Sequence, residues 1–360
     1  MRYEQKTTMQ SLAREQQLNH PETPQASNYV HSSPQPKDDE LSFIGNNNDE
    51  GPPYLMAEIS LQSQLLAEVV GTYILVLIGC GSACVSFYGN NNNIDNTVNI
   101  DHSSWMMWAI GSMLGIYSAA GFSGGHLNPA ITLAFCWVRP TAFSPSKVVP
   151  YFLAQILGAT LATCTLLILF HPAVQDWEEL HFKDIPSKCL TATADGGNVF
   201  LYGVKSHIKA CLPYDQLKLK SVSTFAGYWS QLPCYNVANA LHATIVEAFG
   251  TAFVVFIIFS VTSAHYPVPS AAVPPVVALA LGSMMYMLGP LTGDHLNPAS
   301  EIGRRISGMI WMAWRHQGLK FRELKPLLEM IWYDVLPYII GPLIGGPLGA
   351  FFAEKIQQVY

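Results

Sequence analysis

An eight-residue motif that occurs twice constrains this chain more than any other feature. Residues 123–130 read SGGHLNPA, and residues 292–299 read TGDHLNPA. Each copy is a glycine-containing loop that places an Asn and a Pro at the start of an apolar run. Asn is a favoured helix N-cap, and Pro suits the first helical position because its missing N–H would have no intrahelical partner. Each motif therefore predicts a helix that begins inside a loop.

The first of these helices is too short to cross a membrane. Its apolar run ends at Arg139 and Pro140, which gives about 10 residues and about 15 Å, half of the ~30 Å hydrocarbon core of a bilayer. Asn-Pro is common in the turns of soluble proteins, so one copy would indicate little. Two copies, each preceded by an apolar segment of full length, predict two half-spanning helices in a membrane.

The composition agrees with a membrane protein. Hydrophobic residues make up 50% of the 360 residues and charged residues only 12%, about half the charged fraction of a typical soluble domain. The net charge of −6 lies largely in the first 58 residues and argues against nucleic-acid binding. Six apolar stretches of about 20 residues are candidate transmembrane helices: 69–88, 105–122, 148–170, 244–262, 267–291 and 335–353.

The repeat extends beyond the paired motifs. Residues 67–72 (AEVVGT) match 246–251 (VEAFGT), and residues 111–113 match 282–284, both GSM. Each half thus contains three spans, and because three is odd, the second half enters the bilayer from the opposite side. The two loops then meet near the midplane, which is where inverted-repeat membrane proteins place a permeation or binding site. Irregular backbone is tolerated at that depth only when it is buried or lines a water-filled cavity.

These motifs resemble those of the aquaporin and aquaglyceroporin (major intrinsic protein) family over residues 60–356. The resemblance implies an all-α membrane protein with six tilted helices and two half-helices around one pore per subunit. It also implies a homotetramer in the lipid bilayer of the plasma membrane, with both termini of each chain in the cytoplasm. The expected function is passive passage of water, glycerol and similar small neutral solutes, without a cofactor.

The residues at the pore centre are the two signatures themselves: Asn128, Pro129, Ala130, Asn297, Pro298 and Ala299. The half-helices would point their N-termini at each other, so two positive dipole ends converge and oppose the entry of cations and protons. Each Asn would offer a side-chain N–H to the passing oxygen. The plainer alternative is that both Asn residues serve only as helix caps.

Two carboxylates inside predicted spans need partners, because an intramembrane charge is costly. The resemblance implies that Glu68 and Glu247 each hold a re-entrant loop by accepting its backbone N–H groups, although a proton-relay carboxylate of a transporter is the alternative. His126 is expected to be a packed, hydrogen-bonded loop residue. His295 is less usual at its position, so a pH-sensing role is a second alternative there.

The resemblance places four residues at the outer constriction: Trp108, Met285, Asp294 and Ser300. Trp108 is an aromatic type found in the glycerol-conducting branch. Met285 stands where glycerol channels have Gly and water channels have His. Ser300 is the main departure, because almost every relative has Arg there. The chain is accordingly expected to be an aquaglyceroporin with an atypical filter.

Several alternatives remain open at this point. A short neutral Ser300 beside Asp294 favours relaxed selectivity with a proton or cation leak that Ser300→Arg would reduce. Alternatively, Arg304 or Arg305, on the next helical turn, pairs with Asp294 or supplies the missing charge. A strict water channel and a secondary transporter with broken helices are further candidates. No metal-ligand spacing, nucleophile elbow or phosphate loop indicates an enzyme.

The chain divides into four predicted regions. Residues 1–58 form a polar, disordered cytoplasmic tail, 59–170 the first repeat, 171–242 a long extracellular loop, and 243–356 the second repeat. The long loop contains Cys189, Cys211 and Cys234, which allow one disulfide of unassigned pairing. Residues 313–330 lie either amphipathically at the membrane interface or as a solvated basic loop.

Deletion of residues 1–50 is expected to leave the conducting fold intact, because this tail lies outside both repeats and buries no predicted span. The assembly state of the truncated protein in detergent is the measurement. Loss of assembly on truncation would show that the tail is a structural element.

Overall fold

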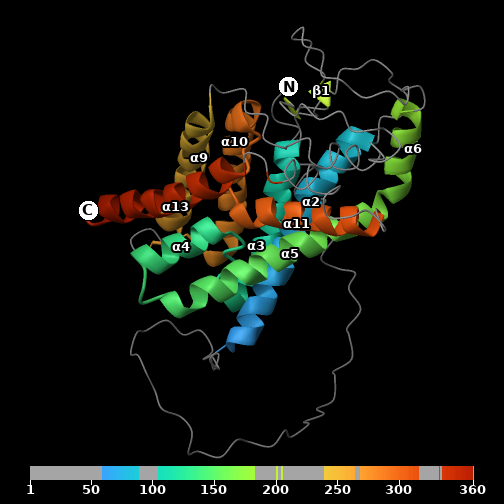
Figure 1. Ribbon diagram of the computed structural model, residues 1–360. Coiled ribbons are helices and arrows are strands. Elements are labelled where there is room, and N and C mark those ends of the chain that lie inside the picture. The colour runs from blue at the N-terminus through green and yellow to red at the C-terminus, as the bar shows by residue number, and fades with distance from the viewer. Residues whose placement is uncertain are drawn as a thin grey trace, which may run out of the picture. The chain divides into compact units, whose positions relative to one another are not determined.

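The computed structural model describes residues 59–88, 104–182, 200–201, 204–205, 239–263, 268–315, 332 and 335–359 (Figure 1). The predicted tail, the three cysteines of the long loop and residues 316–331 lie outside the described residues. The helices are α2 (Leu61–Tyr88), α3 (Ser104–Ser123), α4 (Pro129–Val138), α5 (Val148–Leu169), α6 (His171–Phe182), α9 (Ala240–Val261), α10 (Val273–Thr292), α11 (Pro298–Arg315) and α13 (Leu336–Gln357).

Short elements complete the described chain. Two 3-10 turns, η1 (Pro145–Lys147) and η2 (Ser270–Ala272), lead into α5 and α10. Two-residue strands β1 (Phe200–Leu201) and β2 (Val204–Lys205) pair antiparallel, with Phe200 opposite Lys205. The described protein is otherwise helical, as predicted.

Five of the described helices are long and apolar enough to cross a membrane: α2, α5, α9, α10 and α13. The remaining predicted span, 105–122, corresponds to α3, which has the required length of 20 residues. It is not among these five, because its serine, tryptophan and tyrosine residues lower its mean hydropathy. Several of its residues are buried, among them Trp108, Ser112 and Ala119. The helix α3 therefore also contributes to the packing between helices.

The packing follows the internal repeat. In the first half α2 packs against α3 and α5, and in the second half α9 packs against α10 and α13 in the same way. The two short helices cross over between the halves: α4 packs mainly on α13, and α11 packs mainly on α5 (Figure 1). This exchange joins the two repeats, and it brings the two motif loops together between them.

The second motif helix differs from the first. The half-helix α4 ends at Val138 with Arg139 as its C-cap, as the Arg-Pro pair predicts. In contrast, α11 continues for 18 residues to Arg315, because its sequence has no equivalent helix-ending pair. Beyond its first turns it carries an aromatic cluster in which Trp311 lies 5.1 Å from Trp314 and 5.3 Å from His171, measured between ring centroids. Trp314, which the sequence analysis placed in the 313–330 loop, is therefore helical, and it is 57% exposed.

Candidate functional site

Both motif loops end in capped helices. Asn128 has an extended backbone (φ −155°), and its Oδ1 accepts a hydrogen bond of 2.8 Å from the N–H of Ala130. Asn297 Oδ1 accepts the equivalent bond of 3.0 Å from Ala299. Pro129 begins α4, and α11 likewise begins at a proline. The oxygen of each Asn side chain is thereby committed to its own helix, which fixes the direction of the amide N–H groups.

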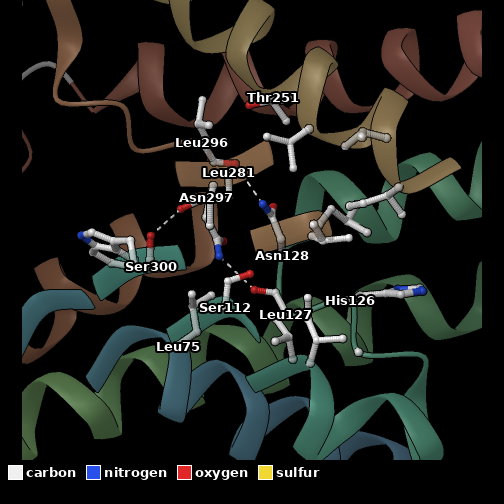
Figure 2. A pocket seen from close by; sticks show the side chains of 18 of the residues that line it. Leu75, Ser112, His126, Leu127, Asn128, Thr251, Leu281, Leu296, Asn297 and Ser300 are labelled. Atoms are coloured by element: carbon white, nitrogen blue, oxygen red, sulfur yellow. Dashed lines mark hydrogen bonds between the residues drawn. The ribbon is translucent and has the colours of Figure 1, made fainter. Parts of the chain in front are cut away.

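The two Asn side chains also tie the loops to each other. Asn128 Nδ2 donates to the carbonyl of Leu296 at 2.9 Å, and Asn297 Nδ2 donates to the carbonyl of Leu127 at 2.9 Å (Figure 2). Sequence reasoning assigned these amides to a passing solute and missed the reciprocal bonds. Because an amide carries two N–H donors, each Asn keeps a second donor after making this bond.

The loops contain unusual backbone conformations. Leu127 and Leu296 have positive φ angles of 53° and 42°, and Asp294 has 51°. Such angles are uncommon for residues with a Cβ atom and persist only where surrounding contacts enforce them. In both loops those contacts include a buried glutamate.

Glu68 is fully buried and accepts hydrogen bonds from the first loop. The backbone N–H of His126 donates to Oε1 at 2.9 Å, and that of Leu127 donates to Oε2 at 2.7 Å. The Ser123 hydroxyl and the Gln155 amide add bonds of 2.6 and 2.7 Å. With four donors around it, the carboxylate is well compensated for burial.

Glu247 occupies the same place in the second repeat with fewer partners. It accepts from the N–H of His295 at 3.3 Å, from that of Leu296 at 2.9 Å and from the side chain of Thr292. The position equivalent to Gln155 is Pro342. Gln155 lies four residues after Tyr151 and Pro342 four residues after Tyr338, and each tyrosine donates a hydrogen bond to the motif loop of its own half. Pro342 has no side-chain donor, so the two loops are held by the same scheme with unequal strength.

The hydrogen bonds of these two tyrosines to the motif loops were missed by sequence reasoning. Tyr151 donates to the carbonyl of Ser123 at 3.1 Å, and Tyr338 donates to the carbonyl of Thr292 at 2.9 Å. A signal was present, because residues 148–151 read VVPY and residues 335–338 read VLPY. This additional repeated motif lies at the start of the last span in each half.

The two motif histidines have different surroundings. His126 Nδ1 lies 3.2 Å from the Thr132 hydroxyl, and its ring stacks on Phe135 with centroids 4.7 Å apart. His295 Nδ1 lies 2.7 Å from Glu301 Oε2, and its ring lies 4.2 Å from that of Tyr338. His126 is thus packed against aromatic rings, whereas His295 contacts a charged group.

A cavity of ≈ 120 Å³ lies where the loops meet, enough for several water molecules at about 10–15 Å³ each. Both motif Asn residues line it, as do the four residues predicted for the constriction. Apolar side chains such as Leu75 and Leu281 line it together with hydroxyl-bearing residues such as Ser112 and Thr251 (Figure 2). The lining is therefore partly apolar and partly hydrogen-bonding.

Residues 56–353 match the sequence pattern of the Major intrinsic protein family. The chain belongs to this family. The glycerol uptake facilitator protein of Escherichia coli (strain K12) is 27% identical over 302 residues, which cover 82% of this chain and 89% of that protein. Aquaporin-1 of Rhizopus delemar is 28% identical over 292 residues, covering 79% and 76%.

The fold is similar to a solved structure of the family. The X-ray structure of the aquaglyceroporin from Plasmodium falciparum matches with a TM-score of 0.56 and 19% identity, covering 83% of this chain and 97% of that one. Together with the apolar helices, family membership makes the chain an integral membrane protein of the aquaporin-like fold.

Within this Major intrinsic protein fold, Ser300 does not reach outward as an arginine would. Its hydroxyl donates to the carbonyl of Asn297 at 2.9 Å, one turn back along α11 (Figure 2). Arg304 also lines the cavity, whereas Arg305 is not among the lining residues. The cationic side chain at the cavity therefore comes from the turn after Ser300.

The anticipated pairing of Arg304 or Arg305 with Asp294 is wrong. Neither carboxylate oxygen of Asp294 has a hydrogen-bond partner within the described part of the chain. Both arginines bind Glu301 instead, since each lies within one helical turn of it on α11. Asp294 is 1% exposed and lies against α9, where a Cβ added at Gly250 would be 3.3 Å from Oδ1.

Proposed function

We propose that this protein is a passive channel for water and small uncharged solutes such as glycerol. The observation that carries the proposal is the cavity lined by Asn128 and Asn297 at the junction of the two motif loops. The similarity to a glycerol uptake facilitator supports glycerol as one solute. The predicted homotetramer and plasma-membrane location are part of the same proposal.

The geometry supports a mechanism for conduction. Each motif Asn is fixed by its cap and by its bond to the opposite loop, so its second N–H donor has a defined direction. A water or hydroxyl oxygen that accepts from both amides is oriented by them. Its hydrogens then point away from the two amides. The apolar wall of the cavity offers them no acceptor. A chain of hydrogen bonds that would carry protons is interrupted at this point.

Trp108, Met285, Asp294 and Ser300 form the proposed outer constriction. All four line the cavity, which supports the assignment. Trp108 offers an apolar face to the carbon backbone of a polyol, and its side chain is 6% exposed. Met285 argues for the alternative, a strict water channel, because its flexible thioether can fill space that glycerol needs.

Stopped-flow light scattering of proteoliposomes tests this proposal with water, glycerol and urea gradients. We expect water and glycerol fluxes that are linear in the gradient and only weakly dependent on temperature. Water flux with glycerol exclusion would establish the strict water channel. A flux that saturates with solute concentration would instead indicate the secondary transporter.

A further inference from the structure

A buried ionic cluster adjoins the cavity, and two of its members, His295 and Arg304, line it. The carboxylate of Glu301 is contacted by three side chains: His295, Arg304 and Arg305. Arg304 Nη2 donates to Glu301 Oε2 at 2.6 Å, and Arg305 Nε donates to Oε1 at 2.6 Å. All four side chains are at most 5% exposed. One carboxylate thus faces two guanidinium groups, and the cluster has an excess of positive charge.

The two arginines differ in what they face. Arg304 lines the cavity, and Arg305 does not. Arg304 Nε donates to the carbonyl of Ser300 at 3.2 Å, and its Nη2 lies 2.9 Å from His295 Nδ1. The guanidinium is therefore anchored at both ends, by the backbone of the motif helix and by the carboxylate of Glu301. Arg304 is the only Lys or Arg among the described residues that line the cavity.

Arg304 lies close, along α11, to the position of Ser300, where the family resemblance places an arginine. Ser300 and Arg304 are four residues apart on α11, so they lie on the same helix face one turn apart. A guanidinium at position 304 reaches the cavity from one turn farther along the same helix. The long side chain covers this distance, and Glu301 holds it in place.

We propose that Arg304 is the ion-excluding residue of this pore and replaces the arginine that relatives have at the position of Ser300. A fixed positive charge beside a narrow, partly apolar cavity repels cations, and the low local dielectric strengthens the repulsion. This inference rests on the proposed channel function. It assigns ion exclusion to one residue, and it predicts a wild-type pore without the leak that Ser300 alone would favour.

The test compares two arginine variants in proteoliposomes loaded with a pH-sensitive dye. Arg304→Gln is expected to raise proton and potassium flux under an imposed gradient by at least about tenfold, since one buried charge changes the barrier by that order or more. Arg305→Gln is the matched control. It also removes one guanidinium that pairs with Glu301, but Arg305 is not among the residues that line the cavity. Its ion flux is expected to stay within about twofold of wild type.

Water flux measured on the same vesicles separates the outcomes. If wild type conducts neither water nor glycerol, the proposed channel function fails. If wild type and Arg304→Gln both conduct water and their ion fluxes are equal, only the assignment of Arg304 fails. Equal increases in Arg304→Gln and Arg305→Gln would also overturn it, because the effect would then belong to the cluster as a whole.

A rescue variant and a conservative variant complete the test. Ser300→Arg introduced into Arg304→Gln is expected to return ion flux to within about threefold of wild type. If Arg304→Gln is not recovered in the membrane, Arg304→Lys decides the question, since it keeps the charge but loses the planar fork. We expect low ion flux in Arg304→Lys because the positive charge remains, and a rise of about tenfold over wild type would contradict the proposal.

Discussion

Glu68→Ala is expected to abolish recovery of a conducting protein. The substitution removes the acceptor for two backbone N–H groups of the first motif loop and for the side chains of Ser123 and Gln155. Each buried donor left without a partner costs about 1–3 kcal/mol, and the positive φ of Leu127 loses the contacts that enforce it. The measurements are folded yield in detergent and water permeability of proteoliposomes.

Two further carboxylate variants set the scale. Glu247→Ala should be damaging but less so, because Glu247 has no counterpart of the Gln155 bond. Glu354→Ala is the control, since its ion pair with Arg139 is partly exposed and such pairs are worth about 0–1 kcal/mol. Equal stability of Glu68→Ala and Glu354→Ala would contradict the assigned function of Glu68 in holding the loop.

Gly345→Val is expected to prevent α9 and α13 from packing. A Cβ at Gly345 would lie 2.0 Å from the carbonyl oxygen of Ala248, and one at Gly349 would lie 2.0 Å from that of Ala252. Glycines four residues apart let membrane helices approach to backbone contact. Overpacking of this kind costs on the order of 3 kcal/mol or more, and we expect a large loss of folded protein and a lower Tm.

Gly121→Val is the matched control for this substitution. A Cβ at Gly121 on α3 would meet no atom within 4 Å, so yield and Tm should remain close to wild type. If both valine variants lowered stability equally, the effect would come from valine in a helix and not from the contact between α9 and α13.

The local features of the site were predictable from the sequence because they depend on near neighbours. Asn128 and Pro129 define the start of α4, and the Arg-Pro pair defines its end, so its bounds follow from short-range signals. The family resemblance, counted from the two signatures, placed Trp108, Met285, Asp294 and Ser300 at one constriction, and all four line the cavity. Their functions as filter residues stay predictions.

Contacts between the two repeats were not predictable in the same way. The reciprocal bonds between each motif Asn and the opposite loop join residues 168 and 170 positions apart. Which carboxylate Arg304 pairs with, that of Asp294 or that of Glu301, depends on where the side chains lie in the folded protein. No periodicity or spacing in the sequence encodes these choices, because they are settled when the halves pack together.

The repeat also conceals differences between its halves. Gly125 in the first motif corresponds to Asp294 in the second, and Gln155 corresponds to Pro342. The second loop therefore gains a buried carboxylate and loses an amide partner for its glutamate. Both changes belong to the half of the chain that also carries Ser300 and Arg304.

The central claim is that solutes pass through the cavity between the two motif loops, and a plugged pore tests it most directly. Leu281 lines the cavity (Figure 2), whereas Leu279, on the same helix, is 69% exposed on the outer surface. We predict that Leu281→Trp lowers water and glycerol permeability together by at least about tenfold, while Leu279→Trp stays within about twofold of wild type. Equal permeability of the two tryptophan variants, at equal folded yield, would contradict a path through this cavity.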